Sequence, residues 1–486
     1  MHRSSCWCIL SRNYTMATLM NGSQYADLSE QKLRNWSLPS TTANGNVSPM
    51  MVRKTAVLGL GTMGRGIAIS LLKAGKIVYV FEMNKTSLDS GVNALYDILH
   101  RLVQRKLMTQ QNMQQLKAAI IPSHNYNDLH DVDLVIEAVF EDKQLKKTIF
   151  KKLDEVCKPS AILATNTSSL NIDEIASVTK RPDKVIGMHF FAPAHLMRLL
   201  ENVRGSNSSP QTIVTAMDLG KQMNKVTVLV GNCKGFVGNR MYFYYIIESD
   251  FLLEEGAYPH EVDKALTDYG FTMGRYQVGD LSGNDVHYRV REMQGMLQKQ
   301  QPTSAPERYR NGVRYCPLAD MLVEAGRHGQ KTDGKGWYQY IAGSRMPRID
   351  PQVIKMIDDH RTKHNIKPRK ISEKEIIERL LYPMINEGFK ILEDGIADNP
   401  WDIDMVWLHG YAWPRNTGGP MFYANTVGLP QVLKVIEERW KLAGASEPHW
   451  KPSKMLTWLI KHHGNPDIND WIKLYKERNA RKRSNL

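Results

Sequence analysis

The sequence has few cysteines and no long hydrophobic run. Its 486 residues include five cysteines, at positions 6, 8, 157, 233 and 316, and no pair has the spacing of a zinc finger or a thioredoxin-like motif. A disulfide framework and a cysteine-based metal centre are therefore not expected, and a reducing compartment fits. No apolar run approaches the roughly 18 residues that would suggest a membrane-spanning helix. Neither a membrane span nor a metal site is predicted.

The sequence also has fewer acidic than basic residues. There are 50 Asp and Glu against 64 Lys and Arg, a net charge of +14, and the isoelectric point is near 9.3. Such a balance occurs in nucleic-acid-binding proteins, but no helix-turn-helix, zinc-finger or aromatic RNA-binding motif is present. We therefore expect no nucleic-acid partner. The excess of positive charge also fits a polyanionic small substrate or cofactor, or simply a basic surface with a basic tail at residues 476–486.

The length of the chain indicates several domains. A chain of 486 residues is too long for one ordinary core, and about two to four domains are expected. Residues 1–50 are predicted to be a disordered extension or linker. Within them, residues 1–26 contain no acidic residue and several Ser and Thr, which resembles a mitochondrial transit peptide. A plain disordered leader is the alternative.

Two kinds of pattern follow this extension. Apolar segments of strand length alternate with helical patterns through residues 51–232, which is typical of a doubly wound parallel sheet. We therefore predict a Rossmann-type α/β domain there. After residue 232 helical patterns dominate, and residues 245–266 are echoed by residues 382–406.

This internal echo predicts a duplicated all-α C-terminal domain. The two repeats are assigned to residues 233–343 and 372–475. Residues 344–371 contain Pro and Lys and are expected to be a linker.

A glycine-rich turn follows the first strand, in KTAVLGLGTMGRGIA at residues 54–68. Gly59 would permit the tight turn, Gly61 would let the backbone approach a pyrophosphate, and Gly64 would allow close helix–strand packing. The helix that begins at Thr62 and Met63 would direct its free N–H groups and positive dipole end at the phosphates. A dinucleotide site is predicted, and a glycine-rich turn in another kind of α/β protein is the alternative.

Glu82 ends the second strand of the pattern. A carboxylate at this place can accept hydrogen bonds from the adenosine ribose hydroxyls, and it would repel a 2′-phosphate. NAD is therefore predicted as the cofactor in preference to NADP.

Candidates for the chemistry lie on later segments. NTSSL, at residues 166–170, follows a strand, His189 ends the segment KVIGMHFF, and Glu201 lies in the next apolar segment. A histidine that titrates near neutral pH is a natural base for an alcohol proton, and a carboxylate on its far nitrogen would fix its tautomer. A buried structural histidine explains His189 as well, and Asn166 and Ser168 could equally be helix caps.

Five motifs together identify a family. GLGTMGRGIA, VIEAVFED, ATNTSSL, GMHFFAPAHLMRLLE and GNCKGFVGNR, with the two helical repeats, resemble the 3-hydroxyacyl-CoA dehydrogenases over residues 52–471. The resemblance is especially to the dehydrogenase part of peroxisomal bifunctional enzymes, which also carry an enoyl-CoA hydratase domain. It implies NAD-dependent oxidation of (S)-3-hydroxyacyl-CoA to 3-ketoacyl-CoA in fatty-acid β-oxidation.

The resemblance also implies residue roles. His189 would abstract the proton of the 3-hydroxyl group with Glu201 as its partner, and Ser168 and Asn239 would hold the reacting oxygens and the cofactor. Further residues assigned to the cofactor site are Asn166, Glu141, Lys146 and Lys331. The phosphates of CoA are expected to meet Arg101, Arg105 and Lys106, unless these form a solvated basic helix face.

The chain also departs from the family. Only about 50 residues precede the α/β pattern, too few for a hydratase domain, so hydratase activity is expected to be absent, whether the chain is a single-function enzyme or a fragment of a bifunctional one. Thr272 and Arg275 stand where the family usually has proline, which bears on loop rigidity and chain-length preference. Single-function relatives dimerise through one helical unit, so two units in one chain are expected to pack together and give a monomer.

The chain ends in Ser484, Asn485 and Leu486, which resembles a peroxisomal targeting signal of the Ser-Lys-Leu type. It predicts a peroxisomal location through the import receptor, and the mitochondrial matrix is the alternative. Two other functions stay open. One is a relative that binds acyl-CoA or NAD without turnover, and the other is a dehydrogenase of this fold for hydroxybutyryl-CoA or a small 3-hydroxy acid.

Overall fold

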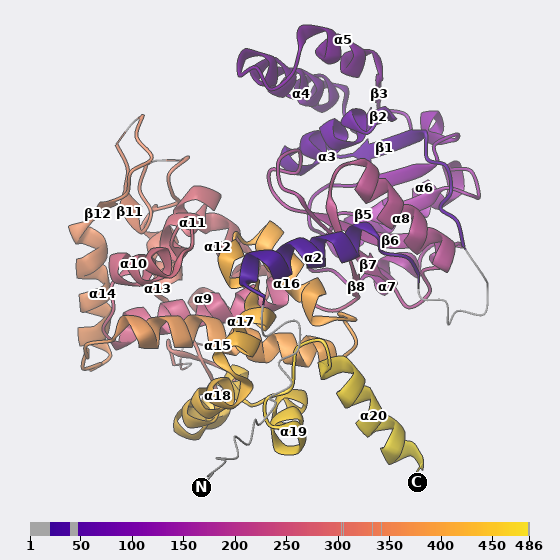
Figure 1. Ribbon diagram of the computed structural model, residues 1–486. Coiled ribbons are helices and arrows are strands. Elements are labelled where there is room, and N and C mark those ends of the chain that lie inside the picture. The colour runs from indigo at the N-terminus through magenta and orange to yellow at the C-terminus, as the bar shows by residue number, and fades with distance from the viewer. Residues whose placement is uncertain are drawn as a thin grey trace, which may run out of the picture.

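The computed structural model describes residues 20–38, 47–302, 304, 306–332, 334–341 and 343–484. An α/β unit and a helical unit lie side by side (Figure 1), which confirms the predicted Rossmann-type domain followed by a helical domain. Among the described helices, none is both long and apolar enough to cross a bilayer. Of the expected targeting signal, Asn485 and Leu486 lie outside the described residues, as do residues 1–19 of the expected leader.

The α/β unit is built on one eight-stranded sheet with the order β3-β2-β1-β4-β5-β6-β7-β8. The strands are β1 (Lys54–Leu58), β2 (Ile77–Phe81), β3 (Ile120–Ser123), β4 (Leu134–Glu137), β5 (Ile162–Thr165), β6 (Val185–Phe190), β7 (Leu199–Arg204) and β8 (Val226–Gly231). The prediction of a parallel sheet is right for β1 to β6 and wrong for the last two strands, because β7 runs antiparallel to β6. Residues 191–198 alone join these two strands, and a parallel crossover needs about a dozen residues or more.

Helices cover both faces of the sheet. They are α3 (Thr62–Lys73), α4 (Lys85–Gln104), α5 (Gln110–Ala118), α6 (Lys143–Val156), α7 (Ile172–Ala176) and α8 (Pro210–Gln222). Val57 belongs to the core shared with α3, α4 and α8, whereas its neighbour Leu58 belongs to the core shared with α6 and α7. Successive side chains of a strand point to opposite faces, so this alternation buries β1 on both sides.

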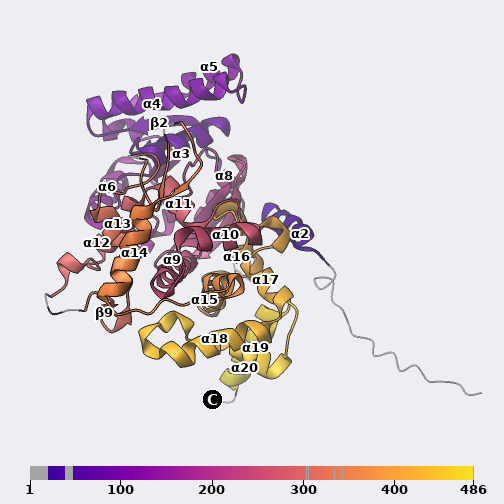
Figure 2. The same ribbon diagram turned by 90° about the vertical axis from the view of Figure 1, so that its left-hand side faces the viewer.

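The helical unit has two halves. The first holds α9 (Gly238–Glu255), α10 (Pro259–Tyr269), α11 (Arg275–Ser282), α12 (Asn284–Met293), α13 (Leu318–Glu324) and α14 (Pro351–Lys363), with the hairpins β9 (Tyr309–Arg310) to β10 (Val313–Arg314) and β11 (Tyr338–Gln339) to β12 (Arg348–Ile349). The second holds α15 (Glu373–Glu393), α16 (Pro400–Gly410), α17 (Pro420–Val427), α18 (Leu429–Ala443), α19 (Lys454–His463) and α20 (Trp471–Ser484). Figures 1 and 2 show α9 and α15 side by side at the centre of this unit.

The two halves share one local design, as their sequence echo predicts. In each, a buried aspartate on one helix accepts hydrogen bonds from the first-turn N–H groups of the next helix. The bonds run from Tyr276 and Gln277 to Asp263, at 2.9 and 3.1 Å, and from Met421 and Phe422 to Asp404, at 2.7 and 3.2 Å. A tyrosine hydroxyl completes each set, from Tyr338 to Asp263 at 2.9 Å and from Tyr25 to Asp404 at 2.8 Å.

The tyrosine of the second half comes from α2 (Gly22–Arg34), which corrects the expectation of a disordered extension over residues 1–50. Tyr25 and Leu33 are buried, and Glu30 accepts a hydrogen bond from Arg198 at 2.5 Å. The helix thus binds the α/β unit with one side chain and the helical unit with another. A capping box of Asn21 and Gln24 starts it, a signal of a helix N-terminus.

The expected linker at residues 344–371 is also corrected, because it contains α14. Asp350 caps this helix, with Pro351 at its first position, where proline is favoured because it needs no N–H partner. His360 on α14 lies 2.9 Å from the buried carboxylate of Glu254 on α9. Proline here starts a packed helix and does not mark an exposed connection.

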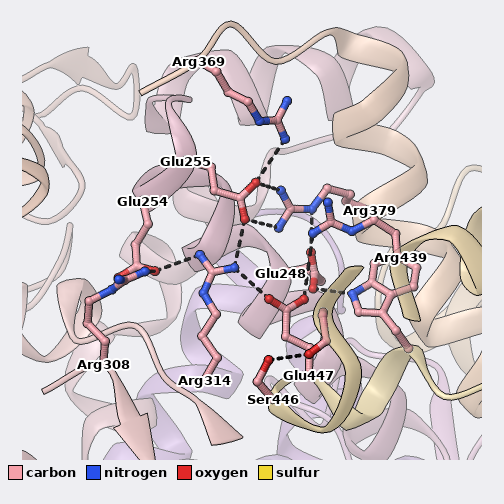
Figure 3. Close-up of polar contacts among 12 residues, drawn as sticks. Glu248, Glu254, Glu255, Arg308, Arg314, Arg369, Arg379, Arg439, Ser446 and Glu447 are labelled. Atoms are coloured by element: carbon pink, nitrogen blue, oxygen red, sulfur yellow. Dashed lines mark hydrogen bonds and ion pairs between the residues drawn. The ribbon is translucent and has the colours of Figure 1, made fainter. Parts of the chain in front are cut away.

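Buried ion pairs join α9 to α15 (Figure 3). Arg379 of α15 donates from Nε to Glu248 Oε2 at 2.7 Å, and from Nη1 and Nη2 to Glu255 at 2.5 and 3.1 Å. Glu254, beside Glu255, accepts from Arg314 at 2.9 Å. Arg379 is 1% exposed and Glu248 is fully buried, so charges of opposite sign are paired inside the junction of the two halves.

Candidate active site

The glycine-rich turn lies where the strand order of the sheet reverses. β1 stands between β2 and β4, and the chain leaves it at Gly59, whose φ of +89° lies in the region that favours glycine. α3 then begins at Thr62, with Gly61 as an N-cap that offers no side-chain hydrogen bond. In doubly wound sheets ligands bind at this point, outside the carboxyl ends of the strands.

The space around the glycines shows what the turn can hold. A Cβ atom on Gly64 would lie 1.7 Å from the carbonyl oxygen of Gly59, so close packing of α3 on β1 requires glycine there. A Cβ atom on Gly61 would meet nothing within 4 Å. The first N–H groups of α3, at Thr62 and Met63, border this open space, which suits the pyrophosphate of a dinucleotide.

Glu82 lies beside the same turn. Its Oε1 accepts a hydrogen bond from the backbone N–H of Leu60 at 2.6 Å, which fixes the carboxylate at the end of β2. Within the described part of the chain no hydrogen bond reaches its other oxygen. That oxygen is free to accept from a ribose hydroxyl, so the residues present fit NAD.

Gly61→Ala is expected to weaken NADH binding while leaving the fold intact. The backbone at Gly61, with φ −65°, accepts any L-residue, and the added methyl group would occupy the space that a pyrophosphate needs. We expect the Kd for NADH to rise at least about tenfold, with the melting temperature within about 2 °C of the wild type. Fluorescence titration with NADH measures the first and a thermal melt the second. An unchanged Kd would contradict the prediction that the pyrophosphate binds at this turn.

His189 and Glu201 form a buried pair on adjacent strands. They are direct partners in the antiparallel register of β6 and β7, and Nδ1 of His189 lies 2.8 Å from Oε2 of Glu201. The rings of Phe191 and Phe236 lie 4.5 and 5.6 Å from the imidazole. The imidazole therefore has a fixed orientation, and within the described residues no hydrogen bond occupies Nε2.

Glu201 is itself held by the start of α9. Its Oε1 accepts from the backbone N–H groups of Val237 at 3.2 Å and Gly238 at 3.1 Å, where the positive end of the helix dipole favours a carboxylate. The carboxylate is fully buried. Because a carboxylate oxygen accepts hydrogen bonds, Nδ1 of His189 is the donor in this pair, and Nε2 is left able to accept a proton.

The NTSSL loop lies at the carboxyl end of β5 and is tied to its surroundings. Oδ1 of Asn166 accepts from the N–H of Phe190 at 2.9 Å, which joins the ends of β5 and β6. The N–H and hydroxyl of Ser168 donate to Glu141 Oε1 at 2.9 and 3.3 Å. Asn239 at the start of α9 donates from Nδ2 to the carbonyl oxygen of Ser168 at 3.4 Å. The structure thus brings Ser168 and Asn239 together.

Lys146 lies beneath this loop in a buried ion-pair cluster. Its ammonium group is 2.7 Å from Glu137 and 3.3 Å from Glu141, and the residue is only 1% exposed. Burial raises the pKa of Glu141, but the charge of Lys146 and a hydrogen bond from Thr167 outweigh it and leave the pKa lowered. Lys146 therefore keeps Glu141 ionised and is itself buried beneath the loop.

Four predicted residues lie away from this centre. Lys331 is exposed on a segment of the helical unit that bonds to α11 through Gln330 and Asp280, at 2.8 Å. The basic residues expected at CoA, Arg101, Arg105 and Lys106, are exposed at the end of α4, at the outer edge of the α/β unit (Figure 1). None of the four contacts the His189–Glu201 pair.

The two positions where the family usually has proline are accommodated differently. Thr272 is exposed, whereas Arg275 is the first residue of α11 and only 4% exposed. Its guanidinium lies 3.8 Å from Asp250. Burial raises the pKa of Asp250 to about 6, although the charge of Arg275 opposes that shift. The matching position of the second half, Pro420, keeps the proline.

Sequence reasoning missed one residue of the site, Tyr411. Its hydroxyl donates to Oδ1 of Asn239 at 2.8 Å, across a sequence separation of 172 residues. Tyr411 ends α16, in the second helical half. No motif contains it, and only the packing of that half on the α/β unit brings it to Asn239.

Comparison with known proteins agrees with this arrangement. The family model "3-hydroxyacyl-CoA dehydrogenase, NAD binding domain" matches residues 54–233, and the model of the C-terminal domain of that family matches residues 235–340 and again 376–467. The double match supports the duplication inferred from the repeats.

Curated and solved relatives extend the match. The chain is 46% identical to the peroxisomal bifunctional enzyme of Danio rerio over 462 residues, which is 94% of this chain and 63% of the relative's length. It is similar to the dehydrogenase part of multifunctional enzyme 1 from C. elegans, at 30% identity and TM-score 0.64 over 91% of this chain and 98% of that one. It also resembles the 3-hydroxybutyryl-CoA dehydrogenase of Escherichia coli, at 25% identity and TM-score 0.69 over 84% and 98%.

These matches cover most of the chain and include the turn, strands and helix start that hold the site. The resemblance read from the motifs is thereby confirmed, together with the NAD cofactor. The chain therefore belongs to the 3-hydroxyacyl-CoA dehydrogenase family, and its first domain is the NAD-binding domain of that family.

Proposed function

We propose that the protein oxidises (S)-3-hydroxyacyl-CoA to 3-ketoacyl-CoA with NAD as the oxidant. The observation that carries the proposal is the His189–Glu201 pair, 2.8 Å apart and buried, on a dinucleotide-binding sheet. Its geometry leaves Nε2 of His189 as a proton acceptor near the carboxyl end of β6. A base and a hydride acceptor at one sheet edge are what the oxidation of an alcohol needs.

The residues of the site divide the work. Nε2 of His189 takes the proton of the 3-hydroxyl group, and Glu201 stabilises the imidazolium that results. NAD, when bound, accepts the hydride from C3. The amide of Asn239 donates to an oxygen of the substrate. The hydroxyl of Ser168 has a single proton, which it donates to Glu141 at 3.3 Å in this structure, and on substrate binding it exchanges this acceptor for an oxygen of the substrate.

The choice of an acyl-CoA substrate rests on the family and on the names of the relatives. The Danio rerio relative is a peroxisomal bifunctional enzyme, which supports a place in peroxisomal fatty-acid β-oxidation for this chain. The ending Ser484-Asn485-Leu486 supports import by the peroxisomal receptor. The packing of the two helical halves on each other supports a monomer.

The test is to follow NADH formation with NAD and a medium-chain (S)-3-hydroxyacyl-CoA. Turnover with the thioester, and little or none with the free 3-hydroxy acid, supports the assignment and its dependence on CoA. NADH binding without turnover of the thioester would contradict it and leave a binding protein.

A further inference from the structure

Tyr411 reaches the active site from the second helical half. It caps the C-terminus of α16, a helix that packs on the edge strand β8 and its neighbour β7. The approach is close, because a Cβ atom on the preceding Gly410 would lie 2.5 Å from Leu199 Cδ2 and 3.4 Å from the ring of Phe191. Glycine at 410 is thus what lets the end of α16 lie against the strand that carries Glu201.

The side chain of Tyr411 contacts two neighbouring residues of α9, one that bonds to Ser168 and one that bonds to Glu201. The hydroxyl of Tyr411 donates to Asn239 Oδ1 at 2.8 Å, and Asn239 bonds to the loop of Ser168. The ring lies on Gly238, where an added Cβ atom would be 2.5 Å from Cε2 of the tyrosine. The N–H of Gly238 is one of the two donors that hold Glu201. Tyr411 therefore contacts Asn239, which bonds to Ser168, and Gly238, which bonds to Glu201.

The ring of Tyr411 is fixed by other aromatic rings. Trp407 stacks on it with a centroid distance of 4.6 Å, Tyr242 lies at 5.2 Å, and Phe191 meets it edge-on at 5.6 Å. Burial, and then the charge of Glu201, raise the pKa of Tyr411 well above its ordinary value. The hydroxyl therefore stays protonated at neutral pH. Because the surrounding rings hold the tyrosine ring in place, the hydroxyl points towards Asn239.

The bonds to Tyr411 and Ser168 together fix the orientation of the Asn239 amide, because a tyrosine hydroxyl can donate or accept, whereas the carbonyl oxygen of Ser168 can only accept. With Oδ1 bonded to Tyr411, the NH₂ group faces the carbonyl oxygen of Ser168, 3.4 Å away. The reversed amide would bring two carbonyl oxygens together at Ser168. The bond to Ser168 is long, so the bond to Tyr411 is the shorter and stronger of the two restraints.

We propose that Tyr411 is a positioning residue for the dehydrogenase reaction, which holds the amide of Asn239 with its N–H donors towards the reacting oxygen of the substrate. The inference rests on the proposed function. It means that the second helical half completes the active site, because the α/β unit and first helical half leave the Asn239 amide without this restraint.

The test is Tyr411→Phe in the full-length chain, with Tyr242→Phe as the matched control. Both variants remove one hydroxyl from neighbouring rings, but only the first removes the bond to Asn239. We expect Tyr411→Phe to lower kcat about tenfold, with the KM for NAD unchanged. Tyr242→Phe should keep kcat within about twofold, and both melting temperatures should stay within about 3 °C of the wild type.

A double-mutant cycle separates positioning from a general structural effect. If Tyr411 acts through Asn239, then adding Tyr411→Phe to Asn239→Ala should cause almost no further loss of kcat. Equal losses in both backgrounds would overturn the inference, and so would a Tyr411→Phe enzyme as active as the Tyr242→Phe control. A wild-type enzyme without turnover would instead refute the proposed function, and this inference with it.

Discussion

Replacing His189 with glutamine is expected to lower kcat by about a thousandfold while NADH binding is unchanged. Glutamine keeps a polar side chain of similar length but cannot accept and hold the proton of the 3-hydroxyl group. The pair with Glu201, at 2.8 Å, lies on β6 and β7, apart from the turn of Gly59 and Gly61. Steady-state NADH formation measures kcat, and fluorescence titration measures the affinity for NADH.

Two further variants make the result specific. His124→Gln changes an exposed histidine at the end of β3 and should keep full activity. Glu201→Gln should lower kcat about as strongly as His189→Gln. Its amide oxygen would keep the two backbone N–H groups of Val237 and Gly238 and its NH₂ group would face Nδ1, which moves the imidazole proton to Nε2 and removes the base. A His189→Gln enzyme with more than about a tenth of the wild-type kcat would contradict the role of His189 as the base.

The local parts of the site could be predicted from the sequence. The turn of Gly59, Gly61 and Gly64 follows a strand and opens a helix, and its function depends on a few consecutive residues. His189 and Glu201 were chosen for their chemistry and family motif. Their pairing is what the family resemblance implies. The way they meet was not predictable, because it depends on β7 running antiparallel to β6 in a sheet that its alternating pattern predicts to be parallel.

The burial of Lys146 can be predicted from its spacing to apolar residues on the same helix. It precedes Ile149 and Phe150 by three and four residues on α6, and both are buried. Residues at this spacing share one helix face, so the helical phase places Lys146 inside, where a lysine needs carboxylate partners. Glu137 and Glu141 provide them.

Contacts between distant segments could not be predicted at all. Tyr25 of α2 and Asp404 of α16 are 379 residues apart and bond at 2.8 Å, and Tyr411 and Asn239 are 172 residues apart. In each case the local sequence is compatible with several environments. Only the docking of whole elements, driven by burial of their apolar faces, decides which polar groups meet.

Replacing Arg379 with methionine is expected to lower the free energy of unfolding by about 3–5 kcal/mol at neutral pH. The buried carboxylate of Glu248 would lose its permanently charged partner and keep only its hydrogen bonds with His449 and Trp450. Arg379 is the shared partner of Glu248 and Glu255, as Figure 3 shows, and Glu248 is fully buried. Methionine fills similar space, so the loss is of charge more than of volume. Urea denaturation of the two proteins measures the difference.

The same substitution at an exposed ion pair is the control. Arg289 bonds to Asp285 at 2.7 Å on the surface of α12, and its side chain is 72% exposed. Arg289→Met should change the free energy of unfolding by no more than about 0.5 kcal/mol, because water and flexibility reduce the value of a surface pair. A similar loss in both variants would mean that burial of the pair is not the cause.

The pH dependence shows whether charge is responsible for the loss at Arg379. Burial raises the pKa of Glu248, but Arg379 and His449 outweigh it and hold the pKa below its usual range; similar partners lower that of Glu254 to about 2. A carboxyl group whose pKa is lower in the folded protein stabilises it above the ordinary carboxyl pKa, and this stability is lost as the pH falls towards the folded value. In Arg379→Met, protonation of Glu248 removes the buried charge that Arg379 no longer balances, so the difference from wild type should shrink steadily between about pH 7 and about pH 4. A difference that stays constant over this range would assign the loss to packing and refute an electrostatic cause.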